Sequence, residues 1–244
     1  MENLRLIYDG KTKRVYVKSD DMLLMEFKDV VTALDGAKVT HAAGKGVLNA
    51  ALTAYFFKLL KSEGIDNHFI HYDGERSVIV KKLSMIPAEV VVRNYAYGGL
   101  VKRLPLLKPL TKLNTPTVEF HYKSDELHDP LILSEDLINA GLVSPHELEV
   151  IKEVSLKVND VLLRRFDGCG LLLLDFKLEF GRDSDGKVLL ADEICGDSVR
   201  VIDSDGRHLD KEVFRRGGSV DDLVKAYTLL ACKLGIDVRG FQCT

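Results

Sequence analysis

The stretch LDFKLEFG, residues Leu174–Gly181, alternates apolar and charged side chains without a break. Because successive side chains of a β-strand point to opposite faces of its sheet, this pattern predicts a strand with one apolar and one charged face. The charged face is a column of Asp175, Lys177 and Glu179, with steps of about 6–7 Å along the strand. The chain must therefore build a sheet that buries the other face in a hydrophobic core.

The charged column has two interpretations. It fits a solvated outer face with cross-strand ion pairs, which are common at protein surfaces. Two features favour a site instead: the apolar run Leu171–Leu174 leads into the column, and the next expected strand returns with Asp192-Glu193. Several carboxylates around one lysine are costly to hold together without a cation, and hard oxygen ligands suit Mg²⁺ that bridges to phosphates. We predict Glu179 and Asp192 as metal ligands.

The remaining pattern predicts short strands and three helices. Strands are expected on both sides of turns at Asp9-Gly10 and Ser19-Asp20, and Asp35-Gly36 reads as another turn. Further strands are expected at Phe69–Tyr72, Val78–Lys82, Val90–Val92, Leu171–Phe180 and Lys187–Glu193, and a loop at Leu104–Pro116. Helices are expected at His41–Glu63, from the capping box at Ser144, and at Ser219–Leu234.

This order of elements predicts an α+β fold with two lobes. The β-rich residues 1–84 form one lobe and the mixed residues 85–244 the other, and a cleft between lobes is where small ligands usually bind. The net charge of −3 without a basic stripe argues against a nucleic-acid partner. With no secretion signal, no membrane-spanning run and four cysteines in no zinc pattern, we expect free thiols and a cytoplasmic location.

Three shorter motifs each allow a site or an ordinary turn. Gly10-Lys11-Thr12-Lys13 lacks the spacing of a Walker A loop but suits a glycine turn over nucleotide phosphates; the alternative is a basic surface turn. Arg93–Gly99 ends a buried strand with a guanidinium and two glycines, which suits a phosphate or carboxylate pocket; on its own the motif fits a plain Gly-Gly turn at least as well. Asp192–Arg200 suits a substrate-binding loop or a polar turn.

These blocks occur in one order over nearly the whole chain, and together they resemble the SAICAR synthetase family (phosphoribosylaminoimidazole-succinocarboxamide synthases). The matching blocks are Tyr8–Lys13, Asp35-Gly36, Gly44–Asn49, Lys81–Arg103, His128–Pro130, Asp175–Gly181 and Asp192–Arg200. The resemblance implies a two-lobed fold similar to ATP-grasp and kinase-like arrangements. It implies a ligase that joins L-aspartate to the carboxylate of the aminoimidazole ribotide CAIR, giving SAICAR, ADP and phosphate, with an acyl phosphate as the expected intermediate.

The resemblance also implies roles for individual residues. ATP would be bound by Lys11 and Lys13 over the phosphates, by Glu179 through Mg²⁺, and by the hinge with Lys82, Leu83 and Met85. Lys177 would stabilise charge in the transition state, and Asp175 would orient its neighbours. The remaining substrate-binding candidates are Arg93, Gly98, Gly99, Arg200, Asp197, Ser198, Lys211, Asp35 and Lys45.

The sequence departs from the family pattern at two places. Gly99 stands where relatives often have serine, and Cys195-Gly196 stands where Ser-Pro is common, which predicts a less rigid loop. Two other functions remain open: a small-molecule kinase with the same ATP and Mg²⁺ site, and a catalytically silent nucleotide-binding module. A homodimer is the default expectation for the assembly.

Overall fold

The computed structural model describes residues 4–33 and 38–243, and the chain forms two compact units. The first unit comprises Met1–Leu83, Ile194–Asp197 and His208–Thr244, and the second comprises Ser84–Glu193 and Ser198–Arg207. The chain thus changes unit between Leu83 and Ser84, beside the lobe boundary expected from the sequence. The two later segments of the first unit were not part of that expectation, which divided the chain only once.

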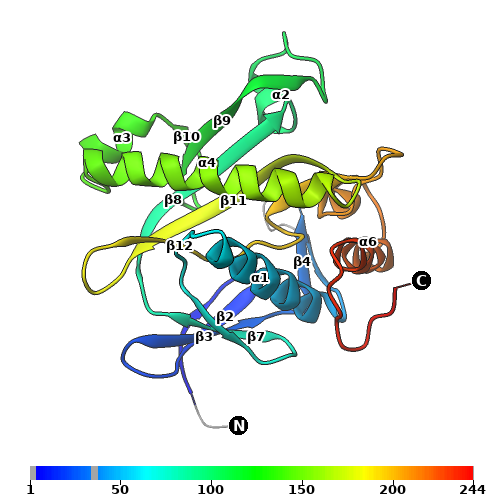
Figure 1. Ribbon diagram of the computed structural model, residues 1–244, viewed down its shortest axis with the longest axis horizontal. Coiled ribbons are helices and arrows are strands. Elements are labelled where there is room, and N and C mark those ends of the chain that lie inside the picture. Colours follow the sequence, from blue (N-terminus) through cyan, green and yellow to red (C-terminus); the bar gives the residue numbers. More distant parts are fainter. Residues whose placement is uncertain (1–3, 34–37, 244) are drawn as a thin grey trace. The chain divides into compact units, whose positions relative to one another are not determined.

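The first unit contains a five-stranded antiparallel sheet in the order β1-β2-β3-β7-β6 (Figure 1). Its strands are β1 (Arg5–Asp9), β2 (Lys13–Val17), β3 (Met22–Phe27), β6 (Phe69–Tyr72) and β7 (Ser77–Lys81). Helix α1 (Lys45–Ser62) packs against β3, β6 and β7, where Phe27 and Val78 are fully buried. The predicted strands and turns are confirmed here.

Helix α1 begins four residues later than predicted. His41 belongs to strand β5 (Lys38–His41), which pairs with β4 (Val30–Ala33), and Gly44 precedes the helix in a left-handed conformation with φ 84°. Because His41 pairs with Val30, the helix begins further along the chain than predicted. The predicted turn at Asp35-Gly36 lies outside the described residues.

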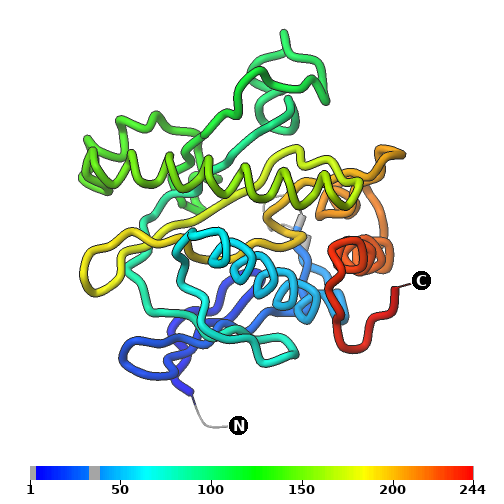
Figure 2. Tube along the Cα trace, viewed as in Figure 1, coloured from blue at the N-terminus to red at the C-terminus, as the bar shows by residue number. Residues whose placement is uncertain are grey.

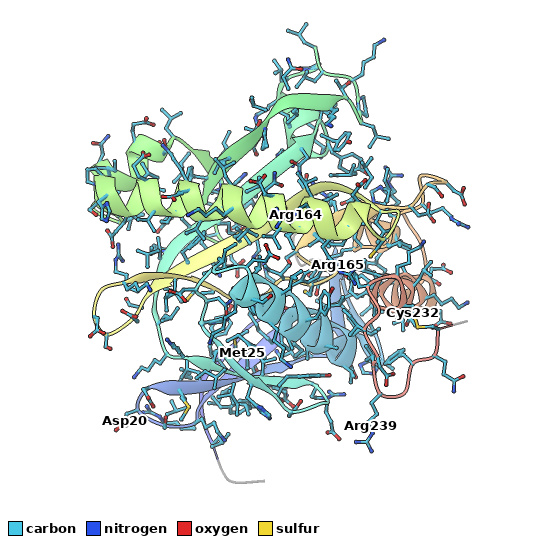
Figure 3. The ribbon with its side chains drawn as sticks, viewed as in Figure 1. Asp20, Met25, Arg164, Arg165, Cys232 and Arg239 are labelled. Carbon is cyan, nitrogen blue, oxygen red and sulfur yellow. A yellow bond between two sulfur atoms is a disulfide. The ribbon has the colours of Figure 1, made fainter. Side chains whose placement is uncertain are left out.

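The C-terminal part of the first unit holds α5 (Glu212–Arg215) and α6 (Val220–Lys233), and α6 packs against α1 and α5. The helix predicted at Ser219–Leu234 is confirmed, and Ser219 caps α6. The tail then folds back along α6 (Figure 2), and Cys232 and Cys243, with Cα atoms 5.4 Å apart, form a disulfide (Figure 3). The prediction of four free thiols is wrong for this pair, because the fold-back brings together residues that the sequence separates by eleven positions.

The second unit contains a sheet in the order β10-β9-β8-β11-β12, with β13 also paired to β11. Its strands are β8 (Ser84–Tyr95), β9 (Lys112–Tyr122), β10 (Leu131–Ile132), β11 (Leu172–Arg182), β12 (Val188–Ala191) and β13 (Val199–Ile202). Helix α4 (Pro145–Asp167) packs against β8, β9, β11 and β12, and Ser144 and Glu147 form the predicted capping box. The short helices are α2 (Gly99–Arg103) and α3 (Ser134–Asn139).

The predicted loop at Leu104–Pro116 is only partly correct, because β9 begins at Lys112. The register between β8 and β9 shifts here: Arg93 pairs with Thr117, and Tyr95 pairs with Lys112. Residues 113–116 therefore form an irregularity in which Pro116 needs no ladder hydrogen bond. Across the part of the chain that the structure describes, no helix is both long and apolar enough to cross a membrane.

Candidate active site

Strand β11 buries the two carboxylates of the charged column and leaves Lys177 partly exposed. Asp175 is 3% exposed and Glu179 is 2% exposed, so the solvated outer face considered from the sequence is not what forms. The apolar side chains of the same strand, Leu174, Phe176, Leu178 and Phe180, are also buried. Both faces of β11 are thus covered, and the charged side chains must find partners inside the unit.

Lys177 lies among carboxylates that we call the Lys177 cluster. Its Nζ is 2.9 Å from Oε1 of Glu89, 2.9 Å from Oε1 of Glu179 and 3.9 Å from Oδ2 of Asp192. Burial alone would lower the pKa of the Lys177 ammonium, but Glu179, Glu89, Asp192 and Glu193 raise that pKa well above its usual value. Lys177 therefore stays protonated.

The Lys177 cluster has an excess of negative charge. Lys123 supplies a second ammonium 2.5 Å from Oε2 of Glu179, so two ammonium groups face the four carboxylates around Lys177. Asp192 takes part from a left-handed backbone conformation with φ 63°. Carboxylate oxygens with an excess of two negative charges are the donor set that a hard dication such as Mg²⁺ prefers, and the residues present therefore fit the metal expected from the sequence.

Asp175 belongs to a separate network of the second unit. Its Oδ2 accepts hydrogen bonds from Nη1 of Arg93 at 2.6 Å and from Nη1 of Arg200 at 3.0 Å. Nε of Arg93 also donates to Oε2 of Glu119 at 2.9 Å, and Arg103 pairs with the same carboxylate. The charged column predicted from alternation thus divides: Asp175 binds arginines, whereas Lys177 and Glu179 bind each other.

Three guanidinium groups surround the Gly98-Gly99 turn. Gly98 has φ 56°, a backbone conformation that favours glycine, and a Cβ placed on it would lie 2.7 Å from Nη1 of Arg200 and would displace that guanidinium. A Cβ placed on Gly99 would lie 3.9 Å from both Nη1 of Arg103 and Nη2 of Arg93, which is ordinary contact. The backbone of this turn therefore lies close to three guanidinium groups, and such groups are what an anion-binding pocket requires.

In the first unit, Asp197 is the centre of a third group, the Asp197 cluster. Its Oδ2 accepts hydrogen bonds from Lys45 and, at 2.7 Å, from Asn49; its Oδ1 accepts one from the Tyr227 hydroxyl at 3.0 Å. Nζ of Lys211 lies 3.7 Å from the same Oδ1. Burial would raise the pKa of Asp197, but Lys45, Lys211 and Asn49 lower it below the usual 3.8.

The other predicted residues lie in simpler surroundings. The turn at Gly10–Lys13 is closed by a hydrogen bond from the Gly10 amide to the Lys13 carbonyl (2.9 Å), and Nζ of Lys28 donates to the Gly10 carbonyl (2.6 Å). The Lys82 amide donates to the Asp21 carbonyl (2.8 Å), and Met85 is 44% exposed. The Ser198 hydroxyl donates to the Glu193 carbonyl (3.4 Å). Asp35 lies outside the described residues.

Sequence reasoning missed several partners in these networks. Glu89 and Arg103 lie in the Lys81–Arg103 block, but the sequence does not show what they contact. The contact of Glu89 with Lys177 follows from the pairing of β8 with β11, which sets Glu89 opposite Glu179. The other missed partners are Lys123, Glu119, Asn49 and Tyr227. Asn49 lies in the Gly44–Asn49 block, but Lys123, Glu119 and Tyr227 lie in no motif, and the contacts of all four join residues far apart in the sequence.

Comparison with known proteins gives a consistent result. The family model described as SAICAR synthetase matches residues 6–228. A phosphoribosylaminoimidazole-succinocarboxamide synthase of Caldivirga maquilingensis is 56% identical over 97% of this chain and 98% of its own length. A solved SAICAR synthetase in complex with ADP is 45% identical, with a TM-score of 0.91 over 97% of this chain and all of its own. The corresponding synthase of Ehrlichia chaffeensis is 36% identical with a TM-score of 0.91, over 96% of this chain and 99% of its own.

Proposed function

Since the chain belongs to the SAICAR synthetase family, we propose that it uses ATP to join L-aspartate to the carboxylate of CAIR, giving SAICAR, ADP and phosphate in purine biosynthesis. The observation that supports this function best is the Lys177 cluster, a half-buried, protonated ammonium beside carboxylates that outnumber the ammonium groups around them. Such a set suits the binding of a cation together with the phosphates of a nucleotide.

For ATP, we propose three groups of residues. Lys11 and Lys13 neutralise the phosphates at the turn before β2, and the chain around Lys82, Leu83 and Met85 offers backbone groups to the adenine. Glu179 and Asp192 would hold Mg²⁺, which when bound neutralises charge on the phosphates. A solved relative binds ADP, and this supports a nucleotide site in the present chain.

For CAIR, we propose that the guanidinium groups around Gly98 and Gly99 bind the phosphate of the ribotide. Arg93 and Arg200 are fixed by their shared bond to Asp175, so the pocket is ordered before the substrate arrives. Asp197, held by Lys45 and Lys211, is an anion in a fixed orientation and accepts hydrogen bonds from the donor groups of the ribotide. Ser198 follows it directly in the chain.

The reaction needs an activated carboxylate, because a free carboxylate is a poor electrophile. We propose that a carboxylate oxygen of CAIR attacks the γ-phosphorus of ATP and expels ADP, forming an acyl phosphate. The amine of aspartate then attacks the acyl carbon, the C–O bond to phosphate breaks, and the amine proton is released. Lys177, which stays protonated, donates hydrogen bonds to the phosphoryl oxygens as charge builds on them.

The test is ADP release by the purified protein with ATP, Mg²⁺ and CAIR, with and without L-aspartate, with the products identified by mass spectrometry. We expect ADP to accumulate with aspartate and a product of the mass of SAICAR. CAIR labelled with ¹⁸O in its carboxylate should transfer one label to inorganic phosphate through the acyl phosphate. A phosphorylated product that accumulates without aspartate would instead indicate a kinase.

A further inference from the structure

Tyr227, in α6, meets the loop Ile194–Asp197 from inside the first unit. The side chain is fully buried, and its hydroxyl donates to Oδ1 of Asp197 at 3.0 Å. Lys45 and Asn49, both in α1, donate to the other oxygen, Oδ2. The two oxygens of one carboxylate are therefore held from two different helices, and the carboxylate cannot rotate without losing a bond.

The ring of Tyr227 also lies directly on the backbone of Gly196. A Cβ placed on Gly196 would lie 2.5 Å from Cζ and 2.6 Å from Cε1 and Cε2 of the ring. Carbon atoms in contact are separated by about 3.5–4.0 Å, so no side chain larger than that of glycine fits at residue 196 while the ring stays in place. One aromatic side chain thus holds both the loop backbone and the carboxylate that follows it.

We propose that Tyr227 is a positioning residue of the ligase reaction: its ring fixes the loop at Gly196, and its hydroxyl fixes the Asp197 carboxylate for CAIR. This inference rests on the proposed binding of CAIR by Asp197. A phenylalanine in α6 would supply the same apolar contacts, so the hydroxyl is the part that a purely structural role does not need.

The protonation of Tyr227 suits this role. Burial, followed by the nearby charge of Asp197, raises the pKa of the Tyr227 phenol well above its usual 10.0. The phenol therefore remains a hydrogen-bond donor wherever Asp197 is an anion, and the contact does not switch with pH across the neutral range.

The first experiment is Tyr227→Phe, compared with Tyr72→Phe as the matched control. Tyr72 belongs to the same unit, and its hydroxyl donates to the Glu75 carbonyl at 3.1 Å in a surface hairpin. We expect Tyr227→Phe to raise KM for CAIR about tenfold, the usual scale for losing a hydrogen bond to a charged group, with KM for ATP unchanged. The control should change neither constant. An unchanged KM for CAIR in Tyr227→Phe would overturn the proposal.

A double-mutant cycle shows whether Tyr227 acts through Asp197. In the Asp197→Asn background, Tyr227→Phe should have little further effect on KM for CAIR, because the contact is already altered. Additive effects would contradict the proposal. The same cycle measured by urea unfolding should also show coupling, and this readout does not depend on activity. If the unfolding cycle shows coupling between Tyr227 and Asp197 but the wild-type protein makes no SAICAR, the proposed function is refuted. The contact between the two side chains would still be established.

A second pair of variants tests the fit at Gly196. Gly196→Ala should lower Tm strongly when Tyr227 is present, and much less in a Tyr227→Leu background, where the ring is gone. An alanine that lowers Tm equally in both backgrounds would show that the ring does not occupy this space.

Discussion

The Asp197 cluster and the Lys177 cluster both gather charged side chains around one central group, but their balance of charge is opposite. Asp197 is one carboxylate that receives two lysines, an amide and a phenol. Lys177 is one ammonium that faces four carboxylates, and Lys123 contributes a second ammonium at Glu179. In the first cluster two lysines neutralise one carboxylate, whereas in the second the carboxylates outnumber the ammonium groups that face them.

The difference shows how buried charge can serve two purposes. A cluster that is neutralised by its own side chains fixes the geometry of one group, because every alternative orientation loses a hydrogen bond. A cluster with excess charge stays costly until a cation enters, so its unfavourable electrostatic energy favours binding. We therefore expect changes at Asp197 to act first on stability and changes at Lys177 to act first on activity.

The largest expected effect is that of Asp197→Ala. It leaves the ammonium of Lys45, which is 0% exposed, without its carboxylate, and breaking a buried ion pair in this way costs about 3–5 kcal/mol. The free energy of unfolding in urea should fall by that amount. Asp197→Asn should lose less, since its amide oxygen still accepts from Asn49. A loss below about 1 kcal/mol for the alanine variant would contradict the view that Asp197 is needed to neutralise the buried ammonium of Lys45.

Lys177→Met should instead leave the protein folded and reduce kcat about 10²–10³-fold, the usual effect of losing one group that stabilises a transition state. Binding of Mn²⁺, measured by calorimetry, should become tighter, because the carboxylates lose a cation that neutralised them. Lys152→Met is the matched control, because it removes a lysine from an exposed ion pair on α4. In that pair Nζ of Lys152 lies 3.6 Å from Oε1 of Glu149. Weaker Mn²⁺ binding by Lys177→Met would argue against the proposed metal site.

Loss of the Cys232–Cys243 disulfide should destabilise the unit that holds the Asp197 cluster. The bridge closes a short loop at the end of α6, and on the chain-entropy account such a bridge contributes about 2–3 kcal/mol. Cys232→Ser should lower Tm, and hydrogen exchange should quicken in α6 but not in β11. The control Cys169→Ser removes a free thiol of the second unit and should leave Tm unchanged.

Acid should weaken the Asp197 cluster in a defined pH range. The pKa of Asp197 is lower in the folded chain than the usual 3.8, so its contribution to stability is present above about pH 4. That contribution is lost as the pH falls towards the folded-state value, with a slope of at most about 1.4 kcal/mol per pH unit for one proton. Urea unfolding between pH 5 and pH 2 should show this slope in the wild type and a shallower one in Asp197→Asn.

The smallest expected effect is that of Gly99→Ser in the second unit. A Cβ fits there at 3.9 Å from two guanidinium groups, so the serine hydroxyl would meet the proposed phosphate of CAIR. One added hydrogen bond corresponds to about 1 kcal/mol, and KM for CAIR should fall several-fold with kcat unchanged. A rise in KM would show that the phosphate lies elsewhere.

Much of the fold could be predicted from the sequence because the local patterns are strong. Alternation located β11, and the capping box at Ser144 located the start of α4. The errors arose where pairing between distant segments overrides local preference. Strand β5 includes His41, which the prediction assigned to α1, and a register shift admits Pro116 into β9. The disulfide depends on the same kind of long-range information.

The candidate site was predictable in its residue types but not in its partners. Alternation placed Asp175, Lys177 and Glu179 on one face, yet two arginines from β8 and β13 separate Asp175 from the other two. The expected flexibility at Cys195-Gly196 took no account of Tyr227, whose ring lies on Gly196. Side chains that reach a loop from a distant helix leave no spacing in the sequence by which to find them.

The left-handed backbone at Asp192 has a consequence for any attempt to improve this protein in the laboratory. Glycine adopts φ 63° without strain, and among residues with a Cβ, asparagine and aspartate tolerate it best. A screen that rewards only heat resistance should therefore enrich Asp192→Gly and Asp192→Asn, which ease the backbone and reduce the crowding of like charges. Such variants would be more stable but inactive, because they lack the proposed metal ligand Asp192. Variants at this position should therefore also be selected for activity.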